Sequence, residues 1–302
     1  MTREHPAPAA EELGVAVPGG ELAVLRWPAA DPAAPTVLAL HGVTGNGLAF
    51  GLLARELAGR ATLVAPDLRG RAGSAGLGGP YGIARHAADA AVAIDRLLGG
   101  RPTVVLGHSM GAWVSTVLAV HHPALVRRLV LVDGALAFPL PAGVTHGEVL
   151  DAVLGPAVAR LSMTFANWPA YRDFWQRHPA WSSLDTAAAD AYLARDLTGA
   201  AAGYRSSCVV PAVELDSTQL LVDPEVTGAV HRLPCPAELL WADRGPLDDG
   251  QALYDAQRLA RSAPAGLTCT RVPDTNHYSI LLGPAGVPLV ARRTLAALGA
   301  AD

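Results

Sequence analysis

Short apolar runs and longer amphipathic stretches alternate along the first half of the chain. The runs are rich in Val and Leu and do not alternate with polar residues, as is typical of strands buried on both faces. Four such runs predict strands at Thr36–Leu40, Ala61–Ala65, Thr103–Leu106 and Leu129–Val132. The stretches between them predict helices at Leu48–Ala58, Ile83–Leu98 and Met110–His121. Strands alternating with helices of these lengths predict an α/β fold with a parallel, doubly wound sheet.

The two ends of the chain add further elements. Leu13–Val17 and Glu21–Trp27 flank a Pro-Gly-Gly sequence and predict a β-hairpin. Near the other end, strand-like runs return at Glu238–Ala242 and Leu267–Val272, and Val287–Leu298 predicts a closing helix. The sheet therefore extends over both halves of the chain.

The region between these halves has a different pattern. Residues 138–235 are helix-like and rich in aromatic side chains, with Trp168, Tyr171, Phe174 and Trp175 at helical spacing. We expect a sheet domain made of residues 1–137 and 236–302, interrupted by a helical cap over residues 138–235. The aromatic stripe is expected to pack this cap, and one face of it could line an apolar pocket.

Composition and charge exclude several classes of protein. With 51% hydrophobic and 17% charged residues, the 302-residue chain is not a long disordered protein. Its net charge of -4 indicates neither nucleic acid nor an anionic membrane as a partner, so we expect a small-molecule substrate. The 23 basic residues are all Arg, which excludes a Schiff-base lysine and a P-loop lysine.

The cysteines and the N-terminal segment bear on metals and location. Cys208, Cys235 and Cys269 are odd in number and lack metal-ligand spacing, so no metal site is expected. Met1–Leu13 is polar and Pro-rich without the apolar core of a signal peptide, and no run of 18 apolar residues occurs. We expect a cytoplasmic protein.

The candidate nucleophile is Ser109, in the sequence Gly-His-Ser-Met-Gly at positions 107–111. This matches the G-x-S-x-G motif, and a predicted strand precedes it while a predicted helix follows it. Such a tight turn requires small flanking residues and holds the serine hydroxyl at the carboxyl end of the sheet. The serine also lies at a helix N-terminus, which favours negative charge nearby.

Two other loops are expected at the same edge. The loop His41–Gly45 follows the first parallel strand and can direct the Val43 N–H toward Ser109. Together with the Met110 N–H it would form an oxyanion hole, while His41 itself is expected to be structural. His277 follows the last strand, and its imidazole is the natural general base for a serine hydroxyl.

With these motifs the sequence resembles the α/β-hydrolase superfamily, from about Leu13 to Leu298. The resemblance rests on the His-Gly pair at 41–42, the segment Asp67–Ser74, the Ser109 turn and the late His277. It implies an eight-stranded, mostly parallel sheet and a cap after the sixth strand. It also implies the chain order nucleophile, acid, base, without a cofactor.

The acid of the triad remains open between three aspartates. The family often places it after the strand that follows the cap, where this chain has Gly245, flanked by Asp243 and Asp248. The family's other position is the end of the preceding strand, occupied here by Asp133. A carboxylate there needs a polar partner, which the His277 Nδ1–H would supply. We therefore expect Asp133, with Asp248 and then Asp243 as alternatives.

These residues predict a serine hydrolase that cleaves an ester, thioester or lactone of a small apolar substrate through an acyl-enzyme. A serine at the turn argues against haloalkane dehalogenase and epoxide hydrolase chemistry, which need a carboxylate nucleophile. One alternative is carbon–carbon bond hydrolysis, or cofactor-free haloperoxidase activity, on the same triad. Another is a ligand-binding protein that keeps the fold without turnover, which the unusual position of the acid favours.

Overall fold

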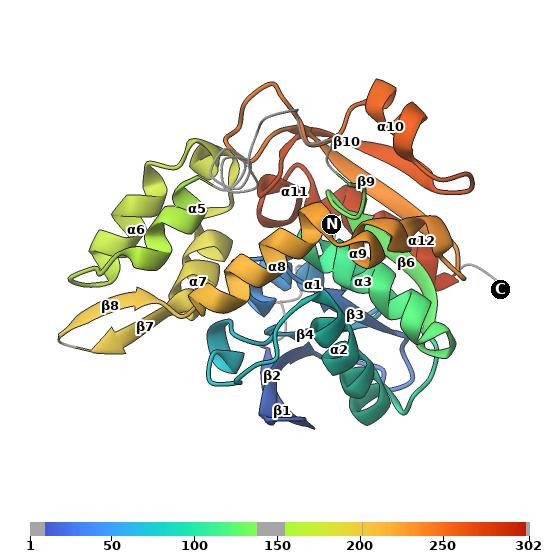
Figure 1. The fold of residues 1–302 in the computed structure, drawn as a ribbon, viewed down its shortest axis with the longest axis horizontal. Helices are drawn as coiled ribbons and strands as arrows, with labels where there is room; N and C mark the ends of the chain where they lie inside the picture. The colour runs from blue at the N-terminus through green and yellow to red at the C-terminus, as the bar shows by residue number, and fades with distance from the viewer. Residues whose placement is uncertain (1–9, 138–154, 201, 300–302) are drawn as a thin grey trace.

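An eight-stranded sheet is the centre of the computed structural model, which describes residues 10–137, 155–200 and 202–299 (Figure 1). The strand order is β1-β2-β4-β3-β5-β6-β9-β10. The pairs β1–β2 and β2–β4 are antiparallel, and the others are parallel. The strands are β1 Glu11–Val17, β2 Gly20–Trp27, β3 Thr36–Leu40, β4 Thr62–Pro66, β5 Thr103–His108, β6 Val126–Val132, β9 Ala237–Arg244 and β10 Thr268–Asn276. The predicted fold class is confirmed.

Helices cover both faces of this sheet. The central strands, such as β3 and β5, are buried on both sides, so successive residues of β3 contribute to different cores. Leu38 and Leu40 join one core with α2 (Ile83–Leu98) and α3 (Met110–His121). Val37 and Ala39 join the other core, with the helices α1 (Gly51–Leu57), α11 (Ser279–Leu282) and α12 (Val287–Gly299).

Residues 155–235 lie between β6 and β9 and are called the insertion below. Much of it lies beside the sheet, at the left of Figure 1, and α6 has its own apolar cluster around Tyr171 and Trp175. Residues 138–154 of the predicted cap lie outside the described residues. The elements of the insertion are α5 Pro156–Ala159, α6 Trp168–Gln176, α7 Thr186–Asp196, β7 Leu197–Ala200, β8 Gly203–Ser206, α8 Val210–Val222 and α9 Pro224–Gly228.

The helical cap predicted from the sequence did not include strands, and here the structure differs, because β7 and β8 form an antiparallel hairpin. Gly199 and Gly203, which lie within these two strands, have φ angles of 139° and 133°, which glycine adopts readily and which are incompatible with a helix. The helix predicted from Leu48 begins only at Gly51, after the 3₁₀ turn Gly47–Phe50. Strand β10 extends past the predicted end, through a register shift between Val272 and Asn276, directly to His277.

Candidate active site

Ser109 occupies a sharp turn between β5 and α3. Its φ of 52° and ψ of −127° are unusual for a residue with a side chain, and such strain persists only where the surroundings impose it. The backbone N–H of Ser109 donates to the Val132 carbonyl oxygen at 2.9 Å, which ties the turn to the end of β6. This is the backbone geometry that the G-x-S-x-G motif predicts.

Close backbone approaches explain the glycines around Ser109. A Cβ atom on Gly107 would lie 2.2 Å from the Gly111 carbonyl oxygen, and one on Gly111 would lie 1.9 Å from the Leu40 carbonyl oxygen. A Cβ atom on Gly134 would lie 2.4 Å from the Ser109 carbonyl oxygen. Because real side chains do not approach backbone this closely, all three positions require glycine, and Gly134 adds to the motif a glycine that follows the end of β6.

His277 and Asp133 meet beside this turn, although 144 positions separate them in the sequence. His277 Nδ1 lies 2.7 Å from Asp133 Oδ2, and both side chains are buried. Asp133 Oδ1 accepts a further hydrogen bond from the Ala242 N–H at 3.1 Å. A carboxylate accepts from an N–H, so in a neutral His277 imidazole this contact favours the tautomer with the proton on Nδ1 and leaves Nε2 as the acceptor.

The two alternative aspartates contact other groups. Asp248 Oδ1 accepts from Arg244 Nε at 2.6 Å and from Asn276 Nδ2 at 2.9 Å. Burial works to raise the pKa of Asp248, but these two donors lower it overall. Asp243 is paired with Arg271. Of the three candidate acids, only Asp133 contacts the His277 imidazole in the structure.

The loop Gly42–Gly45 carries the Val43 amide and is called the oxyanion loop below, after the role predicted for it from the sequence. The Gly42 carbonyl oxygen accepts hydrogen bonds from His41 Nδ1 at 2.8 Å and from the Gly45 N–H at 3.0 Å. The Gly42 C=O and the Val43 N–H belong to one trans peptide unit, in which the two groups point in opposite directions. The bonds to the Gly42 oxygen therefore direct the Val43 N–H away from His41 Nδ1 and the Gly45 N–H. Met110 is the first residue of α3, so its N–H has no partner within the helix.

One cavity brings these groups together. Its lining includes Val43, Ser109 and His277, along with Gly42, Thr44, Gly45, Ala49, His108, Tyr192, Tyr278, Leu281 and Leu282. No direct hydrogen bond joins the Ser109 hydroxyl to His277 among the described contacts. In unliganded enzymes this contact is often long and tightens only with substrate.

Three lining residues have features that the sequence did not indicate. His108 Nε2 donates to the His277 carbonyl oxygen at 2.9 Å, and the two rings lie 4.8 Å apart between centroids. Tyr192 reaches the cavity from the insertion, and burial raises the pKa of Tyr278 to about 12. Both tyrosines stand in the sequence as ordinary aromatic residues, so no motif singles them out.

Two buried histidines lead to a prediction about acid stability. Burial lowers the pKa of His41 and of His108 to about 3. An unfolded chain protonates them near pH 6.5. Below that pH the unfolded state therefore binds more protons, so stability is full above it and falls as the pH falls toward about 3.

We expect each of the two histidines to lower the free energy of unfolding by about 1.4 kcal/mol per pH unit over this range. Urea unfolding at about pH 7.5, 6.5 and 5.5 measures the effect, since most carboxylates stay ionised there. His108→Phe removes one of the two histidines and should reduce the dependence of the free energy of unfolding on pH. An unfolding midpoint that stays constant as the pH falls would contradict neutral burial.

Neither a metal-binding cluster nor a membrane-spanning helix is found among the described residues. Within 10–137, 155–200 and 202–299, no group of three or more His, Cys, Asp or Glu side chains is placed to hold a metal ion. No helix in these ranges combines the length and the apolar composition needed to cross a bilayer.

Known proteins are similar to this chain in part of the sequence or in the fold. LipV, a lipase of Mycobacterium tuberculosis, is 36% identical over 154 residues, which are 49% of this chain and 56% of LipV. The chain therefore spans little more than half of that relative. The structure of an E-2-(acetamidomethylene)succinate hydrolase superimposes with a TM-score of 0.78 at 22% identity, covering 97% of this chain and 100% of that one.

A second structure supports the same fold. The thioesterase domain from the curacin biosynthetic pathway superimposes with a TM-score of 0.68 at 21% identity, covering 96% of this chain and 99% of that one. At such identities the likeness concerns the fold alone. A family model of the alpha/beta hydrolase fold matches residues 35–284, from β3 through α11, and so spans the Ser109 turn, Asp133 and His277. With this match over most of its length, the chain belongs to the alpha/beta hydrolase fold family.

Proposed function

We propose that this protein is a serine hydrolase that cleaves an ester, thioester or lactone of a small apolar substrate through an acyl-enzyme on Ser109. The contact of 2.7 Å between His277 Nδ1 and Asp133 Oδ2, at a cavity that Ser109 also lines, carries this proposal. A base oriented by a buried carboxylate is the arrangement that activates a serine. It also favours turnover over ligand binding alone, because binding does not need an oriented base.

In the proposed reaction, His277 Nε2 takes the proton of Ser109 as the hydroxyl oxygen attacks the substrate carbonyl carbon. The N–H groups of Val43 and Met110 hold the oxyanion. His277 then passes the proton to the leaving oxygen or sulfur, and Asp133 stabilises the imidazolium through Nδ1. A water molecule, deprotonated by His277, releases the acyl group and restores Ser109.

The cavity walls support an apolar substrate. A second cavity adjoins the first, because Tyr192, Tyr278 and Leu282 line both. Its other described walls are apolar or aromatic apart from His178: Trp175, Ala180, Trp181, Leu184, Ala189 and Leu193. No arginine lines either cavity among the described residues, which favours an apolar group over a dicarboxylate, since a buried carboxylate needs a charged partner.

A panel of p-nitrophenyl esters of rising chain length, with thioesters and lactones beside them, tests the proposed function. We expect kcat/KM to rise about fourfold per added methylene, since burying each CH₂ contributes about 0.8 kcal/mol. The rise should stop once the two cavities are filled. Failure to turn over any member of the three compound classes would overturn the proposal.

The second cavity can be shortened from helix α7. Ala189 is buried against it, so Ala189→Leu should move the preferred chain length to shorter esters. The matched control is Ala187→Leu on the same helix, where the side chain is exposed and the preference should not change. Equal preferences in both variants would exclude this cavity as part of the substrate site.

A further inference from the structure

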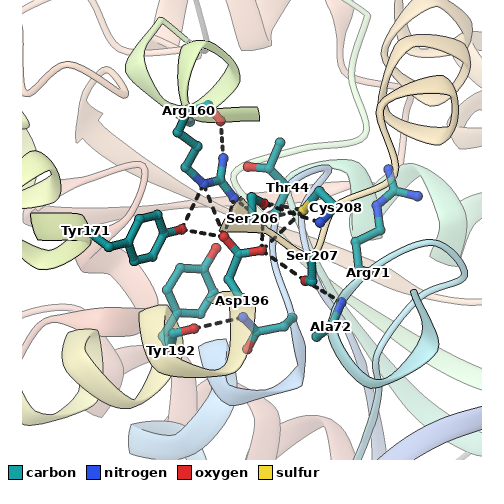
Figure 2. A network of polar contacts seen from close by, with 12 residues as sticks. Thr44, Arg71, Ala72, Arg160, Tyr171, Tyr192, Asp196, Ser206, Ser207 and Cys208 are labelled. Carbon is teal, nitrogen blue, oxygen red and sulfur yellow. Dashed lines mark hydrogen bonds and ion pairs between the residues drawn. The ribbon is translucent and has the colours of Figure 1, made fainter. Parts of the chain in front are cut away.

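Two buried arginines contact the oxyanion loop. Arg71 Nε donates to the Val43 carbonyl oxygen at 2.9 Å, and Arg160 Nη2 donates to the Thr44 carbonyl oxygen at 3.0 Å. Figure 2 shows the Arg160 guanidinium beside Thr44. With the bonds to Gly42 described above, three successive carbonyl oxygens of this loop are held by fixed donors. The orientation of the peptide units on both sides of Val43 is thereby set.

The partner of Arg160 lies on the insertion. Asp196, the last residue of α7, pairs with Arg160 Nη2 at 3.1 Å, and Ser206 of β8 donates to the same carboxylate at 2.8 Å (Figure 2). Tyr171 of α6 also donates to Asp196. Burial works to raise the pKa of Asp196, but the Arg160 charge and these donors lower it overall, so the carboxylate stays ionised.

The partner of Arg71 also lies on the insertion. Arg71 Nη2 and Asp216 Oδ2, on α8, are 2.6 Å apart, and both side chains are fully buried. His86 of α2 contacts the same carboxylate at 2.8 Å. Each arginine that donates to a carbonyl oxygen of the oxyanion loop is thus also paired with a carboxylate of the insertion.

Stability alone does not account for these two ion pairs. Taking both charges out of water is costly, and well-packed apolar residues in their place are often as stable or more so. An ion pair does supply what an apolar pair cannot, namely N–H donors in a rigid fork that point at a chosen acceptor. Here that acceptor is the backbone on either side of the Val43 amide.

We propose that Arg160 and Arg71 are positioning residues, through which the insertion sets the direction of the Val43 N–H in the oxyanion hole. This inference rests on the proposed function of Ser109 and Val43. Neither arginine lines the cavity among the described residues, so both act through the loop and not on the substrate.

Arg160→Lys tests the proposal while keeping a positive charge beside Asp196. The shorter ammonium lacks the fork, so it cannot hold Asp196 and the Thr44 carbonyl as the guanidinium does. We expect kcat to fall about 10–100-fold while KM changes little, because the lost interaction forms fully only in the transition state. The double variant Arg160→Met with Asp196→Asn removes both charges and should give the same kinetic result.

The matched control is Arg195→Lys. Arg195 joins the insertion to Asp67 at 2.6 Å and to Glu12 at 2.8 Å, and it makes no hydrogen bond to residues 42–45 among the described contacts. Weakening these two ion pairs loosens the attachment of the insertion but leaves the hydrogen bonds of the oxyanion loop in place. We expect kcat of Arg195→Lys to remain near the wild-type value.

A pair of inhibitors separates loop positioning from a general structural effect. A trifluoromethyl ketone forms a hemiketal oxyanion with the serine, whereas the methyl ketone of the same chain length binds without one. Arg160→Lys should weaken the trifluoromethyl ketone about tenfold or more and leave the methyl ketone unchanged. Equal inhibition of wild type and both Arg160 variants by the trifluoromethyl ketone, with unchanged kcat, would overturn the inference.

A parallel loss of methyl ketone affinity with unchanged kcat would also overturn it, since the insertion would then only shape the substrate cavity. Failure of the proposed function is distinguishable from either result. In that case the wild-type protein itself would bind the trifluoromethyl ketone no better than the methyl ketone.

Discussion

Ser109→Ala should reduce kcat about 10⁶-fold, which is the scale of loss when an acyl-transfer enzyme of this kind lacks its nucleophile. Without the hydroxyl no acyl-enzyme forms, although the cavity and the His277–Asp133 pair remain. The same variant should lose all labelling by a fluorophosphonate probe, which reacts with an activated serine. Kinetics on the best p-nitrophenyl ester and gel detection of the probe measure the two effects.

The matched control for Ser109→Ala is Ser115→Ala. Ser115 lies on α3, is fully buried, and donates to the Gly111 carbonyl oxygen at 2.7 Å without lining the cavity. This variant should keep both labelling and turnover. A Ser109→Ala protein that is still labelled and still hydrolyses esters would show that another residue is the nucleophile.

Asp133→Asn should reduce kcat about 10⁴-fold. An asparagine in this position can present an N–H to His277 Nδ1, which favours the tautomer whose Nε2 carries the proton and cannot act as a base. The loss should appear in kcat more than in KM, because Asp133 lies behind His277 and not among the cavity walls. Steady-state kinetics over a range of pH measure it.

Asp248→Asn distinguishes the chosen acid from its alternative. Asp248 contacts Arg244 and Asn276, so its replacement disturbs only the segment that leads to His277. We expect its effect on kcat to be far smaller than that of Asp133→Asn. The assignment is wrong if Asp133→Asn retains near-normal kcat while Asp248→Asn loses most of it.

The elements of the sheet were predictable because each has a local cause in the sequence. The helix over Ile83–Leu98 and the strand over Thr36–Leu40 have the predicted boundaries, since the amphipathic and apolar periods end at those residues. The turn at Ser109 was predictable for a related reason. Gly107 and Gly111 are required by backbone approaches that no other residue tolerates. The geometry of the turn can therefore be recognised in the sequence from a short motif.

The hairpin of the insertion was not predictable in this way. Its strands are four residues each, and their stability comes from pairing with each other and with neighbouring segments. Such short segments have too few positions for a period to be recognised. The glycines at 199 and 203 indicate an interruption of helix without saying what replaces it.

The sequence by itself determined the fold class, the strained serine and the supply of candidate acids and bases, because periodicity and backbone sterics act between near neighbours. Only the tertiary structure decided that Asp133 contacts His277 and that Arg160 reaches Thr44, across 144 and 116 positions respectively. For any buried carboxylate or guanidinium, several groups in this chain could serve as the partner that a buried charge requires. Which one it meets depends on how the strands and the insertion pack, and no local pattern carries that information.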